Sequence, residues 1–518
     1  MRFQAASVLL LPLALATPIN PTSDDAQIAP LAENGDHIED AYIVVFKKGV
    51  DTNQIALHLT GIEEQHGLDP LYSFSSDGEV ESGGIKHVYQ PPTSDSGYYG
   101  YAGKFSTNTL ATIRSSPEVA YVERDQIVRT QEIPQGVDDW LESDSDSYPE
   151  SELASDSVTT EKGAPWGLAR ISHRNELRLS TFTEYHYDSH GGDGVTAYIV
   201  DTGINIDHVE FEGRAKWGKT IPKNDVDKDG NGHGTHCAGT VASRKYGVAK
   251  NAKLVAVKVL GSNGSGSMSD VVAGVLWAAE AASAEAADAA KEVAATGKTK
   301  YKGSVANMSL GGGKAKSLDD AVNAAVEAGL HFAVAAGNDN KDACNYSPAA
   351  AEKAVTVGAS TLGDERAYFS NHGKCVDIFA PGLNIFSTWI GGNSSTNTIS
   401  GTSMASPHIC GLLAYLVSIH GTETFNLLNI DLEDSVTPTG LYGKAYSLLP
   451  KLAQAVLPAP EVATNDDVTS SNSKDTLTPA KLKKALVALA TVGKLPSKDL
   501  PAGSPNLLAF NNATHPGK

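Results

Sequence analysis

The chain has 518 residues, with 41 Lys and Arg against 61 Asp and Glu, so its formal charge is −20. A balance this acidic argues against nucleic acid as a partner, because binding phosphates requires a basic surface. Hydrophobic residues make up 41% and charged residues 20%, which are ordinary values for a folded protein and exclude wholesale disorder.

The first residues have the pattern of a signal peptide. Arg2 gives a short positive region, residues 8–15 are apolar, and small residues around Ala16 suit a cleavage site. We therefore expect a signal peptide over residues 1–16 and entry into the secretory pathway. The apolar run is well short of the roughly 20 residues that cross a bilayer, and no later stretch qualifies, so we expect no membrane span.

A small α+β domain is predicted to follow a polar segment. Residues 17–40 are polar and without periodicity, which predicts disorder. Hydrophobic patterns then predict strands at 42–46, 103–105 and 119–122 and helices at 52–66 and 110–113. Over residues 41–128, this order is typical of helices packed on one face of a sheet.

An acidic linker is predicted over residues 129–162. Residues 130–161 hold ten Asp and Glu but no Lys or Arg. Such a stretch repels itself and has little apolar surface to bury, so it should join two domains rather than form one.

The largest domain is predicted over residues 163–450. Continuous apolar runs predict buried strands, and Ala-rich stretches between them predict helices. The strands are expected at 195–200, 254–259, 305–310, 330–335 and 354–357, and the helices at 269–295 and 317–328. The pattern indicates an α/β fold whose mostly parallel sheet has helices on both faces. Residues 451–518, with one helix at 479–491, are interpreted as an appended C-terminal extension.

Three short clusters combine into one catalytic pattern. Asp201 ends an apolar strand, His233 stands between glycines in Gly232-His233-Gly234, and Ser403 precedes an apolar helix. Each alone has a bland explanation as a turn former, a structural histidine or a helix cap. Together they supply a nucleophile, a base and a carboxylate that orients the base. The order Asp, His, Ser excludes an α/β-hydrolase, which runs Ser, Asp, His.

The motifs Asp201-Thr202-Gly203, His233-Gly234-Thr235-His236 and Gly401-Thr402-Ser403-Met404-Ala405 resemble those of subtilisin-like serine proteases, in the proteinase K branch and its fungal vacuolar cerevisin-type members. The resemblance implies a subtilisin-like fold and an Asp201–His233–Ser403 triad. It also implies that residues 41–128 form a ferredoxin-like inhibitory propeptide. The enzyme would thus be a zymogen with broad endopeptidase specificity, its partners being peptide and protein substrates and its own propeptide.

The resemblance also assigns binding residues. Asn338, in Ala336-Gly337-Asn338, matches the oxyanion-hole donor of the family. Two segments match the edges of the substrate channel, and these are Gly264, Ser265, Gly266, Ser309, Leu310 and Gly311. Main-chain groups along such edges can pair with an extended peptide.

No cofactor is expected for catalysis, but a structural calcium ion is. The run Asp225-x-Asp227-x-Asp229 imitates an EF-hand loop, yet its twelfth position is His236 rather than Glu, so we reject that reading. Zinc at His233, His236 and Cys237 is disfavoured by spacing. The resemblance instead implies calcium on the Asp377 carboxylate and the carbonyls of Glu352 and Ala354.

The four cysteines are expected to form one disulfide, between Cys344 and Cys375, and two buried thiols, Cys237 and Cys410. Sequons allow glycosylation, except at Asn307, which lies in a predicted buried strand. A peptide-binding pseudoprotease and an esterase are the rival functions. We expect a monomer in the fungal vacuole, with an extracellular location as the alternative, cleavage of the linker between about residues 155 and 163, and activity that falls as pH drops through about 6–6.5.

Overall fold

The computed structural model describes residues 36–68, 83–91, 97–130, 132–133, 151–153, 158–427, 430, 477–496, 498 and 500–513. The predicted signal peptide and most of the predicted disordered segment lie outside these residues, as do most of the acidic linker and residues 431–476. The described parts are an N-terminal domain (residues 36–130), a central domain (158–427) and a C-terminal segment (477–513).

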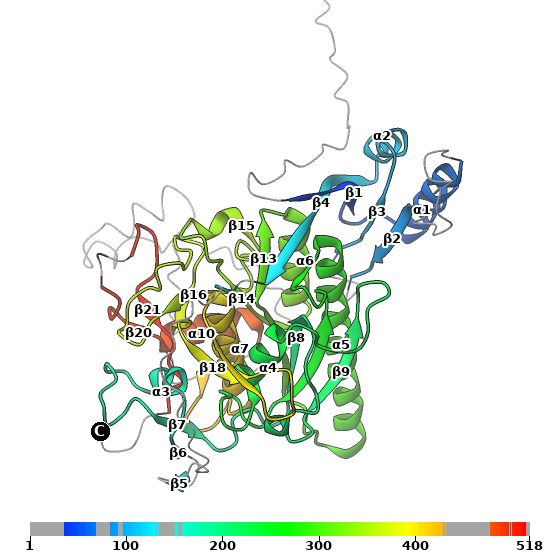
Figure 1. Ribbon diagram of the computed structural model, residues 1–518. Helices are drawn as coiled ribbons and strands as arrows, with labels where there is room; N and C mark the ends of the chain where they lie inside the picture. Colours follow the sequence, from blue (N-terminus) through cyan, green and yellow to red (C-terminus); the bar gives the residue numbers. More distant parts are fainter. Residues whose placement is uncertain are drawn as a thin grey trace, which may run out of the picture.

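A nine-stranded sheet forms the centre of the molecule (Figure 1). In spatial order its strands are β20 (Thr491–Val492), β21 (Leu507–Leu508), β17 (Ile378–Pro381), β16 (Val355–Ser360), β14 (His331–Ala335), β12 (Gly303–Met308), β8 (Val195–Asp201), β10 (Lys253–Lys258) and β9 (Ala215–Thr220). Strand β20 is antiparallel to β21, and the other described pairs are parallel. The predicted mostly parallel sheet is therefore confirmed.

Helices cover both faces of this sheet. One face carries α3 (Trp166–Ser172), α4 (His233–Ala242), α7 (Thr402–Ser418) and α10 (Pro479–Leu489), and the other carries α5 (Met268–Thr296) and α6 (Lys316–Glu327). Residues alternate between the two cores along β8, with Ala197 and Ile199 in the first and Tyr198 and Val200 in the second. Within the described residues, no helix combines the length and hydrophobicity that a membrane crossing requires.

The N-terminal domain is a ferredoxin-like unit that lies at the top of Figure 1. Its elements are β1 (His37–Phe46), α1 (Thr52–Gly67), β2 (Gly84–Tyr89), β3 (Gly100–Lys104), α2 (Thr107–Ser115) and β4 (Val119–Thr130). Strands β1 and β4 extend beyond the predicted boundaries, 41–128, to His37 and Thr130. In residues 37–40 a single apolar residue, Ile38, stands among His37, Glu39 and Asp40 and gives little hydrophobic signal, but backbone pairing of His37 with Gln126 holds the segment in β1. Strand β2 was missed.

Two small sheets are β5 (Ser151–Leu153) with β6 (Val158–Lys162) and β7 (Glu184–Asp188), and the hairpin of β18 (Ile385–Thr388) with β19 (Thr396–Ile399). The short strands β11 (Ser265–Ser267), β13 (Leu310–Gly313) and β15 (Tyr346–Ser347) join the sheet of the N-terminal domain, where β11 and β13 pair with β4 and β15 pairs with β13. The described residues also contain the 3₁₀ turns η1 (Val209–Phe211) and η2 (Ala343–Asn345).

The predicted linker ends too late, because β6 belongs to the central domain. Residues 158–161 are at most 6% exposed, and β6 pairs with β7 along its whole length. The carboxylate of Glu161 lies 2.7 Å from the ammonium of Lys250, so its charge is neutralised on burial. The acidic composition of residues 130–161 predicted a linker, and the short polar strand β6 at its end was therefore not predicted.

The C-terminal segment is not an appendage, contrary to the sequence interpretation. Leu482, Ala485 and Leu486 of α10 are buried in the same core as α4 and α7. Leu508 of β21 pairs with Phe379 of β17, which extends the central sheet. The segment thus supplies part of the central hydrophobic core.

Candidate active site

The carboxyl end of β8 holds Asp201 against the first residue of α4, His233. The carboxylate oxygen Oδ1 of Asp201 lies 2.8 Å from Nδ1 of His233, and both side chains are fully buried. The same oxygen accepts a 2.7 Å hydrogen bond from the backbone N–H of Thr202. Because an ionised carboxylate only accepts, it fixes the proton on Nδ1 and makes Nε2 the basic atom of the imidazole.

The loop that precedes His233 is organised by the buried carboxylate of Asp229. Its oxygens accept from the backbone N–H groups of Gly232 (2.8 Å) and Thr235 (3.0 Å) and from the hydroxyls of Thr235 (2.6 Å) and Thr202 (2.9 Å). Gly232 adopts φ +106°, where an added Cβ would meet a tryptophan ring at 2.6 Å. The acidic run in the sequence therefore shapes the histidine loop.

Ser403 lies in the first turn of α7, beside His233. Pro407 has no N–H to donate to the carbonyl of Ser403, four residues earlier, so that carbonyl is available to other donors. It accepts from the hydroxyl of Ser309 at 2.8 Å and from the thiol of Cys237 at 3.5 Å. The Cys237 sulfur also lies 4.0 Å from Nδ1 of His233, so one side chain contacts both residues.

The hydroxyl of Ser403 is held away from the imidazole in this state. It donates a 2.9 Å hydrogen bond to the backbone carbonyl of Ser309. Among the described residues, Nε2 of His233 has no hydrogen-bond partner, although it is buried. A rotation of the serine side chain is therefore needed before its proton can pass to His233, and such contacts commonly tighten only with substrate bound.

The electrostatics favour a protonatable imidazole at His233 and neutral neighbours. Burial alone would lower the pKa of His233, but its contacts with Asp201 and Cys237 together offset this and raise it above 6.5. Burial lowers the pKa of His236 to about 3 and raises that of the Cys237 thiol, so both stay uncharged. Nε2 of His236 contacts the carbonyl of Ile385, which makes it a structural residue.

Asn338 follows β14, and its amide is oriented by Thr402. The Oδ1 atom accepts from the backbone N–H and the hydroxyl of Thr402, both at 2.9 Å. The Thr402 hydroxyl in turn accepts from the N–H of Gly337 at 3.1 Å. Fixing Oδ1 in this way makes Nδ2 the donor end of the amide. This role of Thr402 was not predicted from the sequence, although Thr402 adjoins Ser403.

Five of the six predicted channel residues contact the chain's own strand β4, which runs between β11 and β13. Residues 265–267 of β11 pair with one edge of β4, and β13 pairs Leu310 with Thr130 and Gly311 with Arg129 on the other edge. The N–H of Thr130 donates to the carbonyl of Gly264 at 3.0 Å. Beyond β4, the N–H of Ile133 donates to the carbonyl of Ser400 at 2.8 Å. Ser309 contacts Ser403, as described above.

The predicted calcium ligands come together around an ammonium group. Nζ of Lys483 lies 2.9 Å from the carbonyl oxygen of Glu352, 2.6 Å from that of Ala354 and 2.8 Å from Oδ2 of Asp377. An ammonium and a divalent cation cannot share this position. The residues of this chain therefore do not fit a calcium ion while Lys483 is in place, and the calcium prediction is corrected accordingly.

Two clusters among the described residues bring three metal-ligating atoms within 4.8 Å of one another. Asp201, His233 and Cys237 form the first, whose Asp–His hydrogen bond is already made. The second consists of the half-buried His173, Glu184 and His186, at the junction of α3 and β7, and sequence reasoning did not find it.

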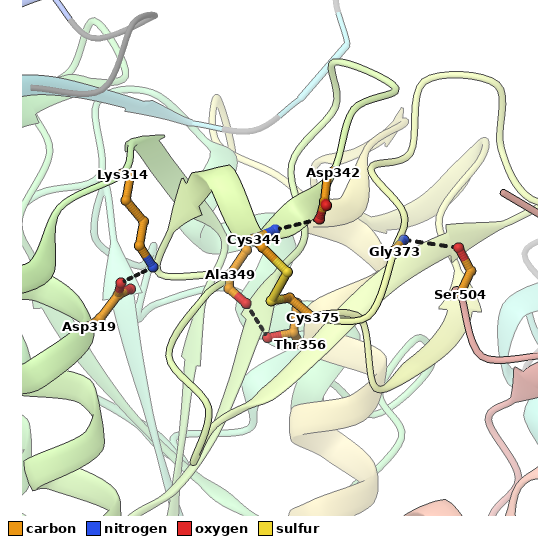
Figure 2. Close-up of a disulfide and its surroundings, with 9 residues drawn as sticks. All are labelled: Lys314, Asp319, Asp342, Cys344, Ala349, Thr356, Gly373, Cys375 and Ser504. Atoms are coloured by element: carbon orange, nitrogen blue, oxygen red, sulfur yellow. Dashed lines mark hydrogen bonds and ion pairs between the residues drawn. A yellow bond between two sulfur atoms is a disulfide. The ribbon is translucent and has the colours of Figure 1, made fainter. Parts of the chain in front are cut away.

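The structure contains the Cys344–Cys375 disulfide (Figure 2). Cys237 and Cys410 are buried thiols. The disulfide lies close to where the C-terminal segment docks, because the N–H of Gly373 donates to the hydroxyl of Ser504 at 2.9 Å. It closes a loop of 31 residues, which is worth about 3–4 kcal/mol by chain entropy. Asn307 is fully buried, which is consistent with an unused sequon.

Comparison with known proteins agrees with this geometry. The Subtilase family profile matches residues 192–428, and the Peptidase inhibitor I9 profile matches residues 41–131. The subtilisin-like serine protease Pen c 2 of Penicillium citrinum is 50% identical over 97% of this chain and 95% of its own length. Alkaline protease 2 of Aspergillus fumigatus is 49% identical over 98% of this chain and 88% of its own length.

A solved structure, that of a cold adapted subtilisin-like serine proteinase, matches 68% of this chain and 99% of its own chain at 38% identity, with a TM-score of 0.49. The identities over nearly the full length of the fungal relatives carry the assignment. The chain belongs to the subtilase family of serine-type endopeptidases, and its N-terminal domain is the I9 inhibitor propeptide.

Proposed function

We propose that this zymogen hydrolyses peptide bonds through Asp201, His233 and Ser403. The observation that carries the proposal is the 2.8 Å hydrogen bond between the Asp201 carboxylate and Nδ1 of His233. His233 takes the Ser403 proton on Nε2 as Oγ attacks the peptide carbonyl, and then gives that proton to the leaving amine. Asp201 holds the reactive tautomer and stabilises the imidazolium.

Asn338 is proposed to stabilise the tetrahedral intermediate. The Nδ2 group would donate to the oxyanion together with the backbone N–H of Ser403, at the start of α7. Support comes from the hold of Thr402 on Oδ1, which fixes the amide before substrate arrives. A preorganised donor of this kind is worth about 3–4 kcal/mol in the transition state.

Broad specificity is proposed because substrate recognition would use main-chain groups. A substrate would replace β4 between β11 and β13 and pair with both as an extended strand. Backbone pairing is common to every peptide sequence, so it sets register without selecting side chains. This reading predicts cleavage at many sites in an unfolded protein substrate.

Activation is proposed to occur on the N-terminal side of Val158. Strand β6 is buried in the central domain, and the ion pair of Glu161 with Lys250 holds it there. Cleavage inside β6 would break this pairing. Our interval of 155–163 therefore narrows to residues before 158, of which 155–157 lie outside the described residues.

A double-mutant experiment tests the triad. Ser403→Ala and His233→Ala should each lower kcat on a peptide anilide by about 10⁶-fold, and the double variant should be no slower, because the residues act as a unit. Ser406→Ala, one turn along α7, is the matched control and should stay within about tenfold of wild type, since it loses one hydrogen bond.

Losses that multiply in the double variant would contradict the triad. Absence of anilide hydrolysis by the processed chain without substitutions would favour the peptide-binding pseudoprotease, and turnover of simple esters with no turnover of anilides would favour the esterase.

We propose the fungal vacuole as the site of action, with secretion as the alternative. The long Ala-rich helix α5 and the sequence at 506–511 support this proposal by their resemblance to the vacuolar type. Fractionation of cells that express a tagged chain separates the two locations. The enzyme is expected to be a monomer, which sedimentation of the processed protein tests.

A further inference from the structure

Lys483 contacts three oxygen atoms at once. Its ammonium lies 2.6 Å from the carbonyl of Ala354, 2.9 Å from that of Glu352 and 2.8 Å from the carboxylate of Asp377. An ammonium carries three N–H donors, so the three acceptors satisfy it fully. We propose that Lys483 is a built-in cation that does the structural work of a divalent metal ion at this position.

The three oxygens lie where two neighbouring strands begin. Ala354 directly precedes β16 and Asp377 directly precedes β17. The strands are parallel neighbours, and Oδ2 of Asp377 also accepts from the N–H of Thr356, at 2.8 Å. Lys483 therefore ties the entry points of two central strands to each other, which is what a bridging cation does.

Helix α10 delivers the ammonium from 106 positions further along the chain than Asp377. Leu482 and Leu486 flank Lys483 and are fully buried, so the helix is anchored in the central core on either side of it. The Lys483 and Asp377 side chains are 21% and 24% exposed. The positive charge thus arrives on a rigid element and loses little freedom when it binds.

The oxygens themselves have no preference for an ammonium. Two backbone carbonyls and a carboxylate are the donors that hard divalent cations such as Ca²⁺ bind. A surface cavity of about 630 Å³, lined in part by Glu352 and Lys483, gives solvent ions access to this corner. Removal of the ammonium should therefore uncover a calcium site whose affinity depends on Asp377.

The test uses the full-length chain with Ser403→Ala added throughout, so that autolysis does not end the melting curve. Lys483→Met keeps most of the side-chain length and removes the charge, whereas Lys483→Ala also opens room for an ion. Lys498→Met, at an exposed position on the same segment, is the matched control. Tm is measured in EGTA and across a CaCl₂ titration.

We expect calcium to leave the Tm of the background protein and of Lys498→Met unchanged. Both Lys483 variants should melt roughly 3–6 °C lower in EGTA, since a partly buried carboxylate loses its partner. Calcium should restore Lys483→Ala in a saturable way, and adding Asp377→Asn should abolish that rescue.

Two results would overturn the proposal. One is a Lys483→Met protein as stable in EGTA as its background. The other is a calcium response that survives Asp377→Asn, or that is equally large with Lys483 present, because the ion would then bind elsewhere or together with the lysine.

Discussion

The N-terminal domain and the C-terminal segment both pack on the central domain, but they do so in different ways. The N-terminal domain has its own hydrophobic core, in which Val44, Phe46 and Ile113 are buried between its sheet and its two helices. The C-terminal segment has none, because Leu482 and Leu486 of α10 belong to the core of the central domain. We therefore expect the N-terminal domain to dissociate as a folded unit, whereas the C-terminal segment stays as part of the hydrophobic core of the enzyme.

The contacts with the central domain differ in the same sense. The Glu123 carboxylate of β4 accepts from the backbone N–H groups of Lys316 (2.7 Å) and Ser317 (2.9 Å) at the start of α6. Asp125 accepts likewise from the N–H of Ser269 at the start of α5, at 3.0 Å. These contacts complement helix N-termini that water can also satisfy, so the N-terminal domain can dissociate after cleavage.

Core substitutions in the two regions should have the largest effects, and these effects should differ between the N-terminal domain and the C-terminal segment. Leu482→Ala should lower the free energy of unfolding of the processed enzyme by about 2–5 kcal/mol, because it leaves a cavity in the central core. The matched substitution Ile113→Ala should leave the stability of the processed enzyme unchanged and speed the loss of the N-terminal domain. Denaturant melts of the processed, fluorophosphonate-inactivated enzymes measure both effects.

If the processed Leu482→Ala enzyme is as stable as wild type, the C-terminal segment is an appendage after all and does not stabilise the central core. A processed enzyme weakened equally by Ile113→Ala would mean that the N-terminal domain never leaves.

Substitution of the carboxylate that contacts the start of α6 should have a smaller effect, on inhibition by the N-terminal domain. Glu123→Ala should weaken inhibition by the N-terminal domain about 10–100-fold, since charge-assisted hydrogen bonds to α6 contribute roughly 1.5–3 kcal/mol. Glu63→Ala, on the exposed side of α1, is the control and should have no effect. The delay before activity appears during processing reports the change, and equal delays in the two variants would rule out the caps as the holding contacts.

The smallest effect is expected from pH. Below the pKa of His233, kcat/KM of the processed enzyme should fall by about tenfold per pH unit. His233 must be neutral to accept the serine proton, and its contacts with Asp201 and Cys237 together raise its pKa above 6.5. Activity of the processed enzyme should therefore decline as pH drops, from a midpoint above pH 6.5 and thus above the 6–6.5 expected from sequence. A value of kcat/KM that stays constant from pH 8 to 4.5 would exclude His233 as the base.

The central sheet and the pairing of Asp201 with His233 could be predicted from local patterns in the sequence. Strands buried on both faces are continuous apolar runs, and the predicted ends of β8, β10 and β14 each lie within one residue of the observed ends. The triad was inferred because its three motifs have a fixed order and distinct residue types. Such signals are local, and no long-range contact has to be known.

What could not be predicted depends on partners far away in the chain. Strand β6 is a Thr-rich polar stretch, and it is buried because Lys250, some 90 positions later, neutralises Glu161. Lys483 is one lysine among several on a helix until Asp377 and the Glu352 carbonyl are placed beside it. Charge and hydrophobicity counted along the sequence cannot register either pairing.

Labelling with a fluorophosphonate during processing tests directly whether Ser403 is the nucleophile of a site covered by the N-terminal domain. We predict that label appears only on the shortened, processed chain, at Ser403 and at one equivalent per molecule, because β4 and Ile133 cover the site until cleavage. Ser403→Ala should take up none. Label on the full-length chain at the same rate, or label at another residue, would contradict an active site formed by Asp201, His233 and Ser403 beneath the N-terminal domain.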